Sequence, residues 1–279
     1  MRWLFAVLAF VIGATVAAAF AGASSWKHAT QASIAELAPV FPEPAVFAAP
    51  SVDALPAPVA RYFRRAITND HPIVRAAIAT QEAEFYINGG WRPLTATQHF
   101  SASPPGFVWD ARIQMAPLMP ALVRDSYIKG RAAMQASVYG AYTMVNERNK
   151  PQLDSGALQR FLGEAIWFPT ALLPSAAIRW TARDDRSAFV TLHDGATSVT
   201  MLFEFGEDGM PVTISGDRYK EDRGSYTMQP WQIRCDRHEL HDGLTIPSYC
   251  EVAWIVNGTR QPYWRGRITS ITYQYDRME

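Results

Sequence analysis

The sequence predicts a mainly β fold of the β-rich α+β class. We expect a large curved antiparallel meander, or half-barrel, that is crossed by one amphipathic helix and preceded by an N-terminal membrane or signal helix. Beyond residue 73, apolar and polar residues alternate along several segments, for example 199–205, and this period is typical of strands with one buried face. Dipeptides that favour two-residue hairpin turns recur between such segments. They are Asn88-Gly89, Asp194-Gly195, Asp208-Gly209, Asp242-Gly243 and Asn257-Gly258.

One clear helix is expected to interrupt the strands. Leu158, Phe161 and Leu162 have the spacing of a single apolar helix face. The polar pair Asp154-Ser155 can cap its start, and the proline that follows Phe168 ends it there. Because strands and helices do not alternate elsewhere in the chain, a parallel βαβ architecture is disfavoured.

The first segment predicts either a membrane anchor or a cleavable signal peptide. Residues 3–23 carry no charge, and at about 1.5 Å per residue they span roughly 31 Å, enough for a bilayer core. The second half is mostly alanine and offers two small-x-small cleavage sites, at 19–21 and 21–23. An anchored protein would carry its domain outside the cytoplasm in the cell envelope, and a cleaved one would be secreted or periplasmic.

The rest of the chain divides into a linker and one domain. We assign residues 1–25 to the anchor or signal peptide, 26–58 to an Ala/Pro-rich linker and 59–279 to a β-rich domain. Between residues 39 and 58 there are six prolines, which exclude a regular helix and favour an extended, semi-rigid spacer.

Composition excludes several classes of function. The 26 Lys and Arg balance the 26 Asp and Glu, so the chain lacks the basic excess by which nucleic-acid binders neutralise phosphates. Aromatic residues make up 12%, which argues against intrinsic disorder. Neither a phosphate-binding glycine loop nor a dinucleotide fingerprint occurs in the sequence, so no cofactor is expected.

The two cysteines are predicted to face each other. If Asp242-Gly243 forms the two-residue turn of a hairpin, Cys235 lies directly opposite Cys250. In an exported protein this pair predicts a disulfide that closes a loop of about 15 residues and adds about 3 kcal/mol in the chain-entropy model. Two free buried thiols are the alternative.

Two short motifs resemble catalytic signatures without meeting their requirements. The run His238-Glu239-Leu240-His241 has its histidines three residues apart rather than four, and on a strand they point to opposite faces, so no metal site is expected. The run Ser126-Tyr127-Ile128-Lys129 matches the S-x-x-K pattern of serine acyl-transferases, but it lies in strand-like sequence and lacks the companion motifs.

Four segments together are similar to an uncharacterised bacterial family of membrane-anchored proteins that carry a domain of unknown function. They are LPAPVARYF at 55–63, GFVWDAR at 106–112, EAIWFPTALLP at 164–174 and PYWRGRI at 262–268. The resemblance covers roughly residues 52 to 275 and implies an anchored β-rich domain, but no reaction. At the level of fold alone, a meander crossed by a helix is also similar to the half-barrels of periplasmic lipoprotein carriers.

The leading functional hypothesis is a non-enzymatic envelope protein that holds a lipid or another apolar ligand between its curved sheet and its helix. The expected apolar lining residues are Trp109, Met115, Trp167, Phe168 and Trp264, and the polar groups expected to orient a headgroup are Arg112, Glu164 and Arg265. Ordinary core packing of these aromatic residues is the other interpretation.

Two further functions stay open. A hydrolase using Glu164 or Asp110 with Arg112 would require a carboxylate with a raised pKa in a cleft beside a cation. A structural partner of another envelope protein would require a large exposed apolar patch.

Overall fold

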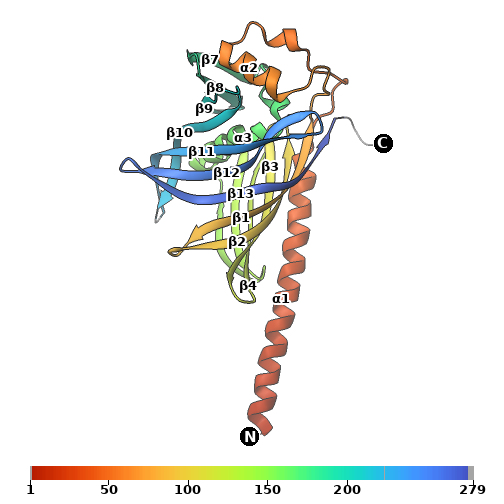
Figure 1. Cartoon of the computed structure of the whole chain (residues 1–279). Helices are drawn as coiled ribbons and strands as arrows, with labels where there is room; N and C mark the ends of the chain where they lie inside the picture. The colour runs from red at the N-terminus through yellow and green to blue at the C-terminus, as the bar shows by residue number, and fades with distance from the viewer. Residues whose placement is uncertain (1, 223, 276–279) are drawn as a thin grey trace.

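The computed structural model describes residues 2–222 and 224–275 and places all of their named strands in one 13-stranded antiparallel sheet. The strand order is β6-β5-β4-β3-β2-β1-β13-β12-β11-β10-β9-β8-β7, and Figure 1 shows that the sheet curls around α3. The strands are β1 (Ala76–Ile87), β2 (Gly90–Ser101), β3 (Gly106–Ala116), β4 (Met119–Ile128), β5 (Arg131–Val138), β6 (Tyr142–Arg148), β7 (Ile178–Asp184), β8 (Ser187–Asp194), β9 (Thr197–Phe205), β10 (Pro211–Asp222), β11 (Ser225–His241), β12 (Leu244–Val256) and β13 (Thr259–Gln274). The predicted curved antiparallel meander is confirmed.

Two meanders, β1–β6 and β7–β13, join through the pairing of β1 with β13. That pairing runs from Ala76 opposite Gln274 to Phe85 opposite Trp264. The start and the end of the domain therefore lie at the centre of the sheet. Side chains from both meanders consequently reach one concave face.

Glycine-containing turns set the register of several hairpins, as predicted. At Asn88-Gly89, Asp242-Gly243 and Asn257-Gly258 both residues have positive φ, which is the requirement of a type I′ turn. At the other two predicted turns, 194–195 and 208–209, only the glycine has positive φ. Gly243 is also needed for space, because a Cβ atom there would lie 2.6 Å from His71 Cδ2.

The predicted crossing helix is α3 (Pro151–Glu164), which continues into the 3₁₀ turns η2 (Ala165–Trp167) and η3 (Pro169–Leu172). Its predicted apolar face, including Leu158 and Phe161, is buried. The helix begins earlier than expected, at Pro151. Asp154 does not cap it, because its carboxylate accepts hydrogen bonds from the Ala132 backbone N–H (2.7 Å) and from Arg131 Nη1 (3.2 Å) on β5.

The helix α2 (Ala57–Ala66) covers the end of the domain formed by β7–β9. Tyr62 and Phe63 are buried, and their rings contact Phe205 and Trp180 at centroid distances of 5.6 and 6.0 Å. These aromatic side chains belong to the same hydrophobic core as the buried face of α3, which includes Leu158 and Phe161.

The first helix, α1 (Arg2–Leu37), extends well beyond the segment expected to form the anchor or signal. Residues 26–37, which we expected in the linker, are therefore helical. The following stretch, which contains the 3₁₀ turn η1 (Ala49–Val52), packs against the domain, because Phe47 and Val52 are buried and the Phe47 N–H donates to His71 O at 2.8 Å. The proline-rich segment is thus an irregular covering of the domain and not a free spacer.

The C-terminal part of α1 lies on the outer face of β3 and β4, whereas its N-terminal part projects away from the domain (Figure 1). Trp26 Nε1 donates to Asp110 Oδ1 at 2.9 Å, and the Arg124 guanidinium stacks 4.6 Å from the centre of the Trp26 ring. Arg124 Nη1 also donates to Thr30 Oγ1 at 2.9 Å. These contacts fix the direction in which the helix leaves the sheet.

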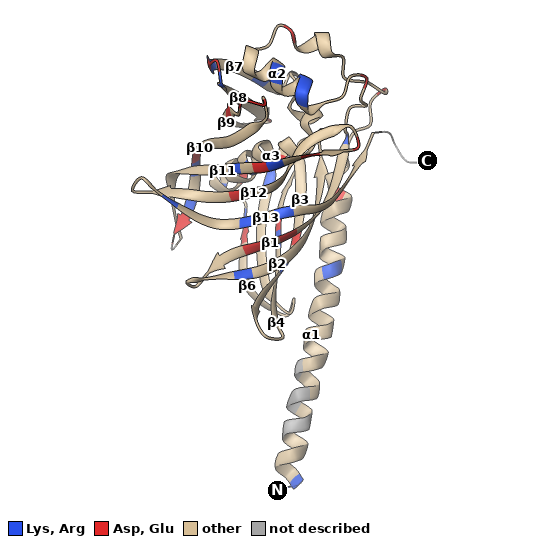
Figure 2. Cartoon of the chain, in the orientation of Figure 1, with Lys and Arg blue, Asp and Glu red and all other residues tan. Residues whose placement is uncertain are grey.

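Charged residues of both signs are distributed over the sheet, whereas the projecting part of α1 carries almost none (Figure 2). Among the residues that the structure describes, no helix has both the length and the apolarity that a membrane crossing requires. The choice between anchor and signal peptide stays a prediction.

Candidate functional site

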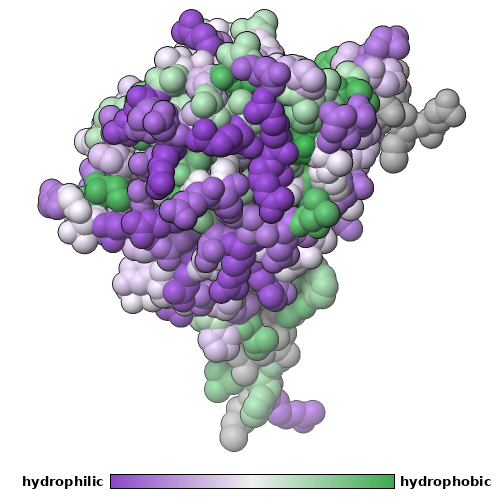
Figure 3. Space-filling view, turned by 45° about the horizontal axis from the view of Figure 1, so that its top comes forward, coloured by the Kyte–Doolittle hydropathy of each residue, from purple (hydrophilic) through white to green (hydrophobic). Residues whose placement is uncertain are grey.

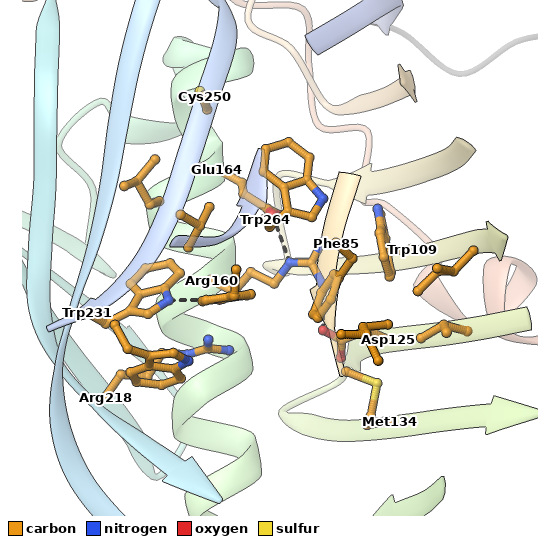
Figure 4. Close-up of a pocket in the computed structure, with 18 of the residues that line it drawn as sticks. Phe85, Trp109, Asp125, Met134, Arg160, Glu164, Arg218, Trp231, Cys250 and Trp264 are labelled. Carbon is orange, nitrogen blue, oxygen red and sulfur yellow. Dashed lines mark hydrogen bonds and ion pairs between the residues drawn. The ribbon is translucent and has the colours of Figure 1, made fainter. Parts of the chain in front are cut away.

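A cavity of about 510 Å³ lies between α3 and the concave face of the sheet (Figure 4). Its size falls within the range of about 300–1,000 Å³ that is usual for small-molecule pockets. Strands of both meanders contribute to its wall, together with α3 and η2. The apolar lining consists of Phe85, Ile87, Trp109, Ile113, Val123, Met134, Ala136, Val145, Gly163, Ile166, Trp167, Trp231, Ile233, Cys250, Val252, Trp254, Tyr263 and Trp264.

The period-two alternation of the strands explains this lining. Successive side chains of a strand point to opposite faces, so Trp231 and Ile233 on β11 both face the cavity, as do Val252 and Trp254 on β12. Gly163 lets α3 lie close to β11, because a Cβ atom at this position would lie 2.6 Å from Ile233 Cδ1.

One wall of the cavity contains a buried ion-pair cluster centred on Arg160. Arg160 Nε donates to Glu164 Oε1 at 2.8 Å, and Nη1 donates to Asp125 Oδ2 at 2.6 Å. The side chains of Arg160, Asp125 and Glu164 are 16%, 7% and 13% exposed. The guanidinium also stacks on Trp109, 4.9 Å from the ring centre. Burial of three charged groups is tolerated here because each one has partners.

A chain of amides connects this cluster to the tryptophan beside it. Gln98 Nε2 donates to Glu164 Oε2 at 2.7 Å, and Gln81 Nε2 donates to Gln98 Oε1 at 3.0 Å. Trp109 Nε1 completes the chain by donating to Gln81 Oε1 at 2.9 Å. Gln81, Gln98 and the Trp109 N–H are therefore satisfied within this chain, while Asp125, Arg160 and Glu164 remain part of the cavity wall.

The environment shifts the protonation of the cluster. Burial raises the pKa of Glu164 above its ordinary value, although the ion pair with Arg160 and the hydrogen bond from Gln98 oppose this shift. Burial lowers the pKa of Arg160, but the two neighbouring carboxylates outweigh it and raise the pKa overall. Arg160 therefore stays charged, while protonation of Glu164 is favoured relative to an exposed carboxyl group.

A second cation, Arg218 of β10, lies at another part of the cavity wall, among aromatic rings. Its guanidinium stacks 4.8 Å from the centre of Trp231 and 5.8 Å from that of Trp254. Its Nε donates to the Gly156 carbonyl oxygen of α3 at 3.1 Å. Trp231 Nε1 donates to the Tyr263 hydroxyl at 2.9 Å, so these rings are held in place as well.

Four of the eight residues predicted to bind ligand line the cavity: Trp109, Glu164, Trp167 and Trp264. Phe168 is buried beside the cavity instead, where its ring packs 4.8 Å from that of Phe100 and 5.9 Å from that of Phe161. Met115 is partly buried near the end of β3 and lies outside the lining.

The two predicted headgroup arginines lie on the wrong side of the sheet. Arg112 is exposed on the outer face of β3, in a polar groove beside Trp26. Arg265 forms an ion pair with Glu84 at 2.6 Å and stacks on Trp91, 4.2 Å from the ring centre. Each is an odd number of residues from an inward-facing tryptophan on the same strand, at 109 or 264, so its side chain points outward. The expectation that they orient a headgroup in the cavity is corrected accordingly.

Asp110, the alternative catalytic carboxylate, is also on the outer face, where it accepts the hydrogen bond from Trp26 Nε1. Burial raises its pKa, while that hydrogen bond and the nearby Arg124 lower it. Asp110 and Arg112 share the polar groove on this outer face, but Asp110 is already engaged by Trp26 of α1, and the groove lies on the opposite side of the sheet from the apolar cavity.

Sequence reasoning missed Arg160, Asp125 and Arg218. The spacing of Arg160 and Glu164, four residues apart on the predicted helix, is typical of an ion pair and could have drawn attention to Arg160. Nothing in the sequence links Asp125 to Arg160, since they come together only through the packing of α3 on β4. Arg218 is likewise placed by strand pairing, because Gly216, two residues before it on β10, lies opposite Trp231 on β11.

Cys235 and Cys250 are directly opposed on β11 and β12, as predicted. Both are buried free thiols, and their sulfur atoms are 3.5 Å apart, with Cys250 at the cavity wall. The contact with Cys235 and burial raise the pKa of the Cys250 thiol, which suppresses the reactive thiolate. Formation of a disulfide stays a prediction.

The motif at 238–241 lies on the end of β11, where His238 Nε2 is 3.2 Å from the Pro211 carbonyl oxygen. Within the described part of the chain, no group of three or more His, Cys, Asp or Glu side chains is arranged to hold a metal ion. Ser126 lies on β4 and Lys129 in the turn that follows it, so they do not share a helix.

Several solved structures are similar to this chain, although only distantly. A putative outer membrane lipoprotein-sorting protein domain from Vibrio parahaemolyticus is 10% identical, with a TM-score of 0.40, and the match covers 80% of this chain and 91% of the other. A LolA superfamily protein from Nitrosomonas europaea is 11% identical, with a TM-score of 0.39 and coverage of 82% and 94%. A DUF1329 family protein from Desulfovibrio piger is 8% identical, with a TM-score of 0.40 and coverage of 72% and 86%.

No curated protein matches the sequence. One protein family, described as a family of unknown function (DUF6920), matches residues 53–273. This range begins just before α2 and ends one residue before the end of β13, so it includes β1–β12, nearly all of β13 and every residue that lines the cavity. The chain belongs to the DUF6920 family.

Proposed function

We propose that this domain binds a lipid or another ligand with an apolar chain in the cavity beneath α3. The observation that carries the proposal is the cavity of about 510 Å³ with its wall of tryptophan, phenylalanine and aliphatic side chains. A cavity of this kind gives an apolar chain contacts on several sides, and each methylene transferred from water contributes about 0.8 kcal/mol. An apolar ligand would therefore be retained without any covalent link.

The polar groups of the wall support binding rather than turnover. Both oxygens of Glu164 accept hydrogen bonds, one from Arg160 and one from Gln98. Arg112, the cation that a hydrolase was expected to use, is on the other face of the sheet. Burial does raise the pKa of Glu164, and a cation, Arg160 of the same helix, lies beside it. Arg160, however, is also paired with Asp125.

A location outside the cytoplasm belongs to the same proposal. The N-terminal part of α1 exposes large apolar side chains, among them Trp3, Phe5, Phe10 and Phe20, which suit a membrane anchor or an export signal. On the face shown in Figure 3, hydrophilic residues predominate over the domain and hydrophobic ones show along the projecting helix. N-terminal sequencing of the protein from its native host tests this part, and an intact Met1-Arg2 terminus would eliminate cleavage.

The binding proposal is tested with a cavity-filling variant. Ala136 lines the cavity, whereas Ala133 on the same strand points to the opposite face. Native mass spectrometry of the full chain, purified without detergent and then exposed to total lipid from its host, is expected to show a bound lipid for the unaltered protein and for Ala133→Trp. Ala136→Trp is expected to lose it. A protein that takes up no lipid, or takes it up equally in both variants, would contradict the proposal.

A further inference from the structure

The geometry points to an anionic amphiphile as the ligand, with its carboxylate or phosphate group bound by Arg218 and its hydrocarbon chain inside the cavity. This inference rests on the proposed function and adds the chemical class of the ligand. Arg218 would recognise the headgroup of this ligand.

The two cations at the cavity differ in their partners. Arg160 is neutralised, because it forms ion pairs with both Asp125 (2.6 Å) and Glu164 (2.8 Å). Arg218 has no such neutralisation. Within residues 2–222 and 224–275, no carboxylate forms an ion pair with it, and its one hydrogen bond is from Nε to the Gly156 carbonyl oxygen. Its terminal Nη groups are therefore available to a ligand.

The position of the Arg218 guanidinium is fixed before any ligand arrives. The hydrogen bond to Gly156 joins it to α3, and its guanidinium carbon is 4.8 Å from the centre of the Trp231 ring. Figure 4 shows Arg218 and Trp231 on the same side of the cavity. A guanidinium that keeps two terminal nitrogens in one plane can bind the two oxygens of a carboxylate or phosphate together. Because the cation is already oriented, little side-chain entropy is lost when it binds an anion.

A second positive charge reinforces this part of the wall. Lys220 lies two residues further along β10, on the same face as Arg218, and its Nζ is 5.7 Å from the centre of the Trp254 ring. Arg218 itself is 5.8 Å from that ring. Two cations thus flank one tryptophan that also lines the apolar cavity, which places a positive group directly beside hydrophobic surface. That juxtaposition matches an anionic headgroup on an alkyl chain.

The test compares ligands that share a chain and differ in the headgroup. Isothermal titration of the full chain with decanoate, decyl phosphate, 1-decanol and decylamine, at about pH 8 where the carboxylic acid is ionised, is expected to give the tightest binding for the two anions. We expect about a tenfold preference for decanoate over 1-decanol, as for a charge-assisted hydrogen bond. Inorganic phosphate and acetate, which lack the chain, are expected to bind far more weakly than the two anionic amphiphiles.

The matched variants are Arg218→Met, which keeps the unbranched apolar stem, Arg218→Lys and Arg112→Met. We expect Arg218→Met to bind decanoate and 1-decanol equally, with the affinity for 1-decanol unchanged, and Arg218→Lys to keep part of the preference. Arg112→Met, on the outer face, is expected to behave like the unaltered protein. Unchanged binding of 1-decanol also shows that the altered protein still has its fold and cavity.

The outcomes separate the two proposals. If the unaltered protein binds 1-decanol as tightly as decanoate, or if Arg218→Met keeps the full preference, the assignment of Arg218 is overturned while the apolar cavity stands. If none of the four decyl ligands binds, the proposed function itself fails, and this inference fails with it.

Discussion

At the scale of single residues, the Arg160 cluster determines how polar the cavity wall is. Three charged side chains are buried there, and each is compensated by the others and by Gln98. Removing one member of such a cluster leaves its partners charged and unpaired in the interior. This lowers the stability of the fold more than replacing the whole cluster with apolar side chains would.

Arg160→Met is therefore expected to lower the free energy of unfolding by about 3–5 kcal/mol. The matched control is Arg186→Met, because Arg186 forms an exposed ion pair with Glu207 at 3.9 Å, and exposed pairs contribute about 1 kcal/mol or less. Urea unfolding of both variants measures the difference. Equal losses for the two would show that the Arg160 cluster does not have the role assigned to it.

The pH dependence of stability follows from the raised pKa of Glu164. Because the folded protein favours the protonated form, the contribution of Glu164 to stability is fully present below its ordinary pKa of 4.5 and is lost as the pH rises through its pKa in the folded state. In urea unfolding at a series of pH values, the unaltered protein should lose stability relative to Glu164→Gln as the pH rises above 4.5. A difference that is constant with pH would mean that burial does not shift this group.

At the scale of elements, α1 is held to the sheet by Trp26. Its indole N–H satisfies Asp110, whose pKa is raised by burial, and its ring supports Arg124. These contacts attach α1 to the outer face of β3 and β4, while its N-terminal part projects from the domain. The inner faces of the same two strands line the cavity.

Trp26→Phe keeps an aromatic ring beneath Arg124 but removes the hydrogen-bond donor to Asp110. Loss of a hydrogen bond to a partly buried charged group is expected to cost about 1–3 kcal/mol, and amide hydrogen exchange in residues 26–37 should become faster. Trp3→Phe, at the projecting end of the same helix where the side chain is 75% exposed, is the control and should change neither quantity. Faster exchange in both variants, or in neither, would contradict the account.

How much of the elements could be predicted depends on how local their signals are. The Asn-Gly and Asp-Gly turns and the alternation of the strands are local, and the meander was predicted from them. The start of α3 was not predicted correctly. Asp154 is a suitable helix cap by residue type, but its carboxylate accepts hydrogen bonds from Ala132 and Arg131 of β5 instead. A tertiary contact of this kind leaves no trace in nearby sequence.

The same distinction applies to the site. Trp109 and Trp264 were recognisable as large apolar residues, and they do line the cavity. The outward orientation of Arg112 and Arg265 could have been derived from the period of two along their strands. They were chosen as headgroup ligands for their charge, without regard to the face of the sheet on which they lie. The pairing of Arg160 with Asp125 joins a helix to a distant strand, so only the fold reveals it.

At the scale of the whole molecule, the pairing of β1 with β13 is what creates a binding site. It joins two meanders into one curled sheet, and α3 lies inside the curl in contact with strands of both. Tyr62 and Phe63 of α2 pack against β7–β9 at one end of the sheet, and a cavity of about 510 Å³ lies beneath α3. The fold thus encloses apolar surface without filling the enclosed volume.

The most direct test of this account is the dependence of affinity on chain length, measured by isothermal titration of the full chain with straight-chain fatty acids from octanoate to hexadecanoate. If the hydrocarbon chain enters the cavity, each added methylene should tighten binding about fourfold until the cavity is full, after which the gain should stop. Affinity that does not change with chain length, or that rises equally in Ala136→Trp, would contradict the claim that this domain holds an apolar chain beneath α3.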